Sequence, residues 1–70
     1  MTRLEQLRKQ RGMPYYVLAR RANASVSTLM LWEKHGLVPK RRDVIERIAR
    51  ALGVEPDELL EDSEKEVSEA

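Results

Sequence analysis

The sequence predicts an all-α fold of five short helices. Three glycines are each followed within two or three residues by one of three prolines, in the pairs Gly12 and Pro14, Gly36 and Pro39, and Gly53 and Pro56. This spacing is typical of a helix that ends at glycine and is followed by a helix that begins at proline. Apolar residues between these points recur at helical spacing. No segment alternates with a period of two over a useful length, so we expect no sheet.

The predicted helices cover residues 2–11, 14–22, 26–35, 43–52 and 56–60 or 61. Thr2 and Glu5 have the spacing of a capping box, which indicates where the first helix begins. Leu4 and Leu7 form its inward side.

The second and third predicted helices, within residues 18–39, are separated by only a few residues. Small residues keep the contact between them thin, namely Ala19, Ala22 and Ala24. Ser25 has the side chain and the position to cap the third helix, and Leu29 and Trp32 form an inward apolar pair. Two helices joined in this way form a helix-turn-helix.

This geometry limits what the third helix can do. A helix with its side chains is about 10–12 Å wide, which matches the width of the major groove of B-DNA. Binding to double-stranded DNA is therefore the leading functional hypothesis.

The remaining elements complete the expected core. The apolar side of the fourth predicted helix consists of Val44, Ile45, Ile48, Ala49 and Leu52. A short fifth helix would close the core with Leu59 and Leu60. We expect residues 1–61 to form one domain and residues 62–70 to form a frayed, acidic tail.

Charge divides the chain into two parts. Residues 1–54 carry twelve Lys or Arg against four acids, a net charge of +8, whereas residues 55–70 carry eight acids and one Lys, a net charge of −7. The basic part suits a polyanionic partner. The acidic end fits a solubilising tail, and a role in orienting the basic part toward phosphates stays open.

Three segments together resemble a known family: LEQLRKQRGM at the start, LARRANASVSTLMLWE in the centre and IARALGVEPDELL near the end. They are similar to the lambda-repressor/Cro (XRE-type) DNA-binding domain over residues 2–61. The resemblance implies a compact five-helix, lambda-repressor-like domain with the helix-turn-helix at helices two and three. It also implies that the third helix enters the major groove, that the start of the second helix contacts phosphate, and that the domain binds as a homodimer.

A second resemblance is local. The segment LARRANASVSTLMLWEKHGLVPKRR is also similar to the head of MerR-type regulators, including Gly36, Leu37, Val38 and Pro39. The MerR pattern continues into a strand-built wing, whereas this chain continues into a predicted helix. We therefore rank the MerR-type resemblance lower.

The exposed positions of the third helix are unusually apolar for the XRE pattern. The candidate base contacts there are Val26, Ser27, Thr28, Met30 and Leu31. The apolar residues could touch thymine methyl groups while the hydroxyls hydrogen-bond to bases or phosphates. Alternatively, Val26, Met30 and Leu31 form a patch that docks a protein partner.

The candidate phosphate contacts are Tyr15, Arg20, Arg21, Lys34, Lys40, Arg41 and Arg42. Tyr15 stands where the family often has Gln, and its hydroxyl could reach phosphate or be partly buried. The run from Lys40 to Arg42, in the predicted loop before the fourth helix, is the densest basic segment. Each of these cations could instead be an ordinary solvated side chain.

The sequence gives no support for an enzyme. It has no cysteine, a single histidine and no glycine-rich phosphate loop, so we predict no cofactor and no metal site. No apolar run is long enough to span a membrane, and the charged start lacks the apolar segment of a signal peptide. We expect a cytoplasmic protein.

Overall fold

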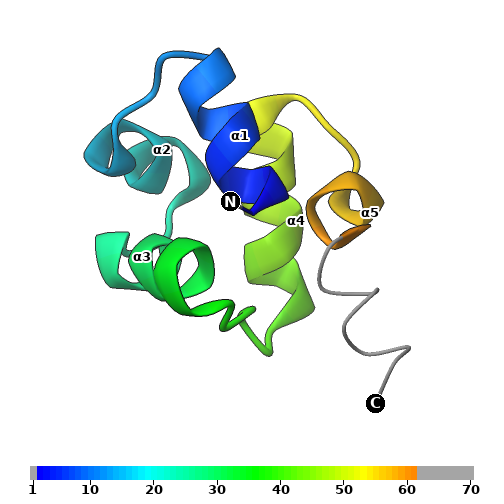
Figure 1. Ribbon diagram of the computed structural model, residues 1–70. Coiled ribbons are helices and arrows are strands. Elements are labelled where there is room, and N and C mark those ends of the chain that lie inside the picture. The colour runs from blue at the N-terminus through cyan, green and yellow to red at the C-terminus, as the bar shows by residue number, and fades with distance from the viewer. Residues whose placement is uncertain (1, 62–70) are drawn as a thin grey trace.

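The computed structural model describes residues 2–61, which form five helices and no strand (Figure 1). The helices are α1 (Arg3–Gln10), α2 (Tyr15–Ala22), α3 (Val26–His35), α4 (Arg42–Leu52) and α5 (Pro56–Leu59). The all-α prediction is therefore confirmed, and a helix, not a wing, follows α3. The expectation for residues 62–70 lies outside the described residues.

Several predicted boundaries differ from the observed ones by a residue or two, at both ends of the first helix, the start of the second and of the fourth, and the end of the fifth. The difference at the fourth helix bears on the basic run. The fourth helix begins at Arg42 and not at Asp43, so Arg42 belongs to the helix and Arg41 is its N-cap. Asp43 then lies in the first turn of α4, where a carboxylate interacts favourably with the helix dipole. Only Lys40 and Arg41 of the basic run lie outside a helix.

Side-chain caps fix the starts of α1 and α3. The Oγ1 of Thr2 accepts a hydrogen bond from the backbone N–H of Glu5 at 3.1 Å, and the Oγ of Ser25 accepts one from Thr28 at 3.1 Å. The other end of α3 is Gly36, whose φ of +67° lies in the left-handed region that favours glycine. Local sequence signals thus determine both ends of α3.

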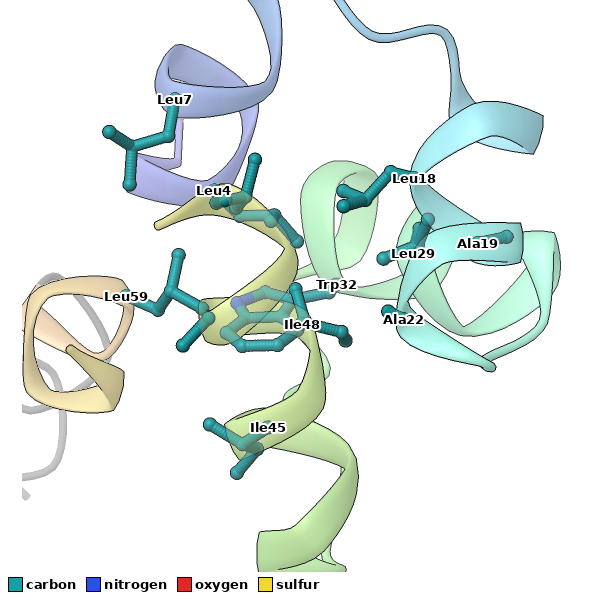
Figure 2. Close-up of a cluster of buried hydrophobic side chains, with 12 residues drawn as sticks. Leu4, Leu7, Leu18, Ala19, Ala22, Leu29, Trp32, Ile45, Ile48 and Leu59 are labelled. Carbon is teal, nitrogen blue, oxygen red and sulfur yellow. The ribbon is translucent and has the colours of Figure 1, made fainter. Parts of the chain in front are cut away.

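A tryptophan lies at the centre of the core. Trp32 has no exposed surface, and Figure 2 shows it between Ile48 of α4 and Leu59 of α5, with Leu4 of α1 nearby. The other fully buried large residues are Leu18 and Leu29. Because α3 supplies the central residue of the core, the whole domain holds one face of this helix in place.

Two arginines tie separate helices together through backbone carbonyls. Arg47 of α4 donates to the carbonyls of Ala22 at 3.0 Å and Asn23 at 3.3 Å, at the end of α2. Arg11 donates from Nε to the carbonyl of Leu52 at 2.7 Å, at the end of α4. These carbonyls have no partner within their own helices, so the arginines satisfy acceptors that would otherwise depend on water. Part of the positive charge of the chain therefore stabilises the fold.

None of the helices among the described residues has the length and apolar character needed to cross a membrane.

Candidate nucleic-acid interface

The helix-turn-helix is formed by α2 and α3, which lie on one side of the molecule while α5 lies on the other (Figure 1). The turn between them contains Asn23 in the left-handed conformation, with φ of +53°. Ala19 and Ala22 are buried and Ala24 is half-buried, which agrees with the prediction that small residues lie between the two helices. The chain therefore places α3 at an edge of the domain.

The helix α3 has two faces of different character. Its buried face consists of Leu29, Trp32 and Glu33. Its exposed face includes apolar side chains, because Met30 is 39% exposed and Leu31 is 45% exposed. The prediction that Leu29 and Trp32 face inward is confirmed.

A shallow depression of about 300 Å³ lies on the exposed face of α3. Its lining residues are Ser27, Met30, Leu31, Lys34 and His35. Their spacing of i, i+3, i+4, i+7 and i+8 places them on one continuous side of the helix. The lining thus combines the apolar side chains of Met30 and Leu31 with the cation of Lys34.

The predicted base-contact residues do not all lie in this depression. Ser27, Met30 and Leu31 line it, whereas Val26 is exposed at the start of the helix. Thr28 is half-buried, and its Oγ1 lies 2.8 Å from the Oγ of Ser25. Its hydroxyl therefore already has a partner in the cap of α3.

The predicted phosphate contacts fall into two groups by their ion pairs. Of these predicted contacts, four exposed cations have no ion-pair partner within residues 2–61: Arg20, Arg21, Lys34 and Lys40. Arg41 pairs with Asp43 at 3.2 Å, and Arg42 pairs with Glu46 at 3.5 Å. Both pairs are exposed to solvent and contribute little to stability, so they could exchange their carboxylates for phosphates.

Tyr15 is directed into the protein. Its hydroxyl donates a hydrogen bond to Oε1 of Glu33 at 3.0 Å. Burial and this hydrogen bond to a carboxylate raise the pKa of Tyr15 above its ordinary value. A phosphate contact through this hydroxyl would require the bond to Glu33 to break, and the contact stays a prediction.

The structure also contains a buried ion pair that sequence reasoning missed. Arg8 donates from Nε to Oε2 of Glu33 at 2.7 Å and from Nη2 to Oε1 at 3.1 Å. The guanidinium also lies 4.2 Å from the centre of the Tyr15 ring and donates to the carbonyl of Met13 at 2.9 Å. The hydrogen bonds to Glu33 outweigh burial and raise the pKa of Arg8. One signal was available, because Arg8 has helical spacing from Leu4 and so belongs to the inward side of α1.

This triad, Arg8, Tyr15 and Glu33, joins α1, the start of α2 and α3. Bidentate pairing of a guanidinium with a carboxylate fixes both side chains in one geometry. The triad thus sets how α3 sits against the two helices before it. Among residues 2–61 no group of side chains is arranged to hold a metal ion.

Comparison with protein families agrees with this geometry. The family model for the Cro/C1-type HTH DNA-binding domain matches residues 3–65, which is most of the chain. Comparison with curated proteins and with solved structures gives no match. Domains of this family bind DNA, and their fold is a known non-enzymatic fold. The chain therefore belongs to the Cro/C1-type helix-turn-helix DNA-binding domains.

Proposed function

We propose that the protein is a transcriptional regulator that binds specific duplex sequences by placing the exposed face of α3 in the major groove. The observation that supports this most is the division of α3 into two faces. Trp32 and Leu29 anchor one face in the core, while Met30 and Leu31 point away from it with Lys34 beside them. A helix held in this way can enter a groove without losing its contacts to the domain.

Cations of α2, of α3 and of the loop after α3 would supply most of the affinity. Arg20, Arg21, Lys34 and Lys40 are exposed, and no carboxylate among residues 2–61 competes with a phosphate for them. Arg41 and Arg42 would join them by giving up weak pairs. Phosphate contacts of this kind position a protein on DNA, while base contacts give the sequence preference.

The proposal includes a symmetric homodimer on a palindromic or near-palindromic site. A single ten-residue helix can read only a few base pairs, and two copies related by a twofold axis double the sequence that is read. Leu37, which is 58% exposed, and the half-buried Val38 are candidates for the contact between copies. Leu59 is fully buried in the core of its own chain and is not available for it. We further propose that residues 1–61 are the DNA-binding domain and that residues 62–70 are an acidic tail.

Selection of bound duplexes from a random pool tests this function. We expect enrichment of one sequence, and affinity for it should fall steeply with salt because each phosphate contact releases counterions. Lys34→Ala and Lys40→Ala should each lower the slope of log K against log salt by about 0.9. Lys9→Ala is the matched control, since Lys9 is also exposed but pairs with Glu5 on α1 at 3.1 Å. Absence of enrichment would contradict the proposal.

The exposed apolar side chains of α3 support a second candidate function. Val26, Met30 and Leu31 could dock a protein partner instead of DNA. In that case selection from the random pool would enrich no duplex sequence. Met30→Glu or Leu31→Glu would abolish the complex with the protein partner while thermal stability stayed nearly unchanged. The cations without ion pairs favour DNA, so this candidate ranks second.

A further inference from the structure

We infer that α3 recognises its site mainly through the C5-methyl groups of thymine, and not through bidentate hydrogen bonds to purines. This inference rests on the proposed function and names the base feature that the exposed face reads. It predicts that the preferred half-sites contain thymines at the positions that contact Met30 and Leu31.

The first argument is the set of hydrogen-bonding groups on the helix. Direct readout of guanine commonly uses Arg or Lys, and readout of adenine uses Asn or Gln, each forming two bonds to the base edge. The residues of α3, VSTLMLWEKH, include no Arg, Asn or Gln. The carboxylate of Glu33, which could accept from cytosine, is buried and bonded to Arg8.

The remaining polar groups of α3 are also poorly placed to form hydrogen bonds with base edges. The Thr28 hydroxyl lies 2.8 Å from the Ser25 hydroxyl in the cap. Lys34 and His35 are in the last turn of the helix, where cations suit the helix dipole. In the docking geometry of helix-turn-helix domains the N-terminal residues of this helix contact base edges. Only Ser27, at the start, combines a hydroxyl with a place in the depression.

The second argument is the shape and charge of the exposed face. Met30 and Leu31 form the apolar part of the 300 Å³ depression, and Lys34 lines the same depression. Val26 adds a third apolar side chain that is 37% exposed near the start of the helix. A polyanion with methyl groups on its surface matches both features, and in unmodified DNA only thymine presents a methyl group in the major groove.

The expected effect follows from the burial of each methyl group. Burying one such group stabilises a contact by an amount that corresponds to about a fourfold change in affinity. Replacing thymine by uracil removes the methyl group and keeps the base-pairing edge. Two contacted thymines should therefore account for a loss of about 15-fold.

The experiment uses the full chain and the duplex selected from the random pool. Affinity is measured with thymine and then with uracil at the positions that the bound protein protects, and uracil outside the protected region is the control on the DNA. The same pair of duplexes is titrated with the double variant Met30→Ala, Leu31→Ala. Leu37→Ala is the control on the protein, because Leu37 is exposed and apolar but lies outside the depression.

We expect the uracil duplex to bind the unmodified chain more weakly, and this difference to shrink in the double variant but persist in Leu37→Ala. Equal binding of the two duplexes would overturn the inference and leave the proposed function standing. A difference that persists unchanged in the double variant would also overturn it, because other residues would then contact the methyl groups. Failure to enrich any duplex would instead contradict the proposed function. The thymine and uracil comparison needs no variant, so misfolding of the double variant would not remove the test.

Discussion

Each face of α3 departs in one respect from the usual distribution on a surface helix, in which apolar side chains are buried and polar side chains are exposed. The buried face contains a carboxylate, Glu33, next to Trp32, whereas the exposed face presents Met30 and Leu31. Glu33 is buried together with hydrogen-bond donors from Arg8 and Tyr15, so its burial is compensated. Met30 and Leu31 are 39% and 45% exposed in the free domain, and in the proposed function it is duplex DNA that covers them.

The comparison shows that charge alone does not locate a binding surface in this chain. Arg8 and Arg47 are as cationic as Arg20, yet they bond to groups inside the domain and stabilise it. The cations that we propose as the main phosphate contacts are Arg20, Arg21, Lys34 and Lys40, which have no carboxylate partner among residues 2–61. Substitutions on the two faces should therefore differ in their effect on stability.

The largest expected effect comes from the buried carboxylate. Glu33→Ala should lower the free energy of unfolding by about 3 kcal/mol, because it leaves Arg8 buried without its partner. Glu46→Ala is the matched control, since Glu46 also pairs with an arginine on a helix but is exposed, and its loss should cost less than about 1 kcal/mol. Urea unfolding of both variants measures the difference. Similar losses in the two variants would show that the triad does not hold α3.

A smaller effect is expected from the Tyr15 hydroxyl and should depend on pH. Burial and the bond to Glu33 raise the pKa of Tyr15 in the folded state above about 10. The contribution of the neutral hydroxyl is therefore complete below pH 10 and is lost as pH rises through the folded-state pKa. Tyr15→Phe should lower the free energy of unfolding by about 1 kcal/mol at neutral pH. The variant should also lose less stability than the unmodified chain as the pH rises through the folded-state pKa of Tyr15.

Tyr16→Phe serves as the control for this measurement, because Tyr16 is 68% exposed. Urea unfolding at several pH values between 8 and 11 would give the pH dependence of the free energy of unfolding for each variant. If Tyr16→Phe changed the alkaline slope as much as Tyr15→Phe, the assignment to Tyr15 would be wrong.

The smallest effect on stability is expected on the exposed face. Met30→Ala and Leu31→Ala should each change the free energy of unfolding by less than about 1 kcal/mol, because both side chains are partly solvated already. Thermal unfolding followed by circular dichroism measures this directly. A loss close to that of Glu33→Ala would mean that these residues belong to the core and not to an interface.

Local features of the fold could be predicted from the sequence. The bounds of α3, the cap at Ser25 and the inward position of Trp32 follow from signals within a few residues of one another. The burial of Glu33 could not be predicted in this way, because its partner Arg8 is 25 residues distant in the chain. Arg47 was likewise unassigned, since the carbonyls that it binds belong to the end of a different helix.

The candidate site shows the same limit. Sequence spacing identified the exposed side of α3, but it did not distinguish Ser27, which lines the depression, from Thr28, whose hydroxyl is engaged in the cap. It also placed Tyr15 among the phosphate contacts, because it did not reveal the hydrogen bond from the Tyr15 hydroxyl to Glu33. Both distinctions depend on side-chain partners that only tertiary structure provides.

The most direct test of the central claim is a nuclear magnetic resonance titration of the protein with its selected duplex. If the exposed face of α3 enters the major groove, the methyl signals of Met30 and Leu31 should shift most and show contacts to thymine methyl protons. Leu29, on the buried face, should move little. Unchanged signals from Met30 and Leu31, with the largest shifts on α4 or α5, would contradict the account.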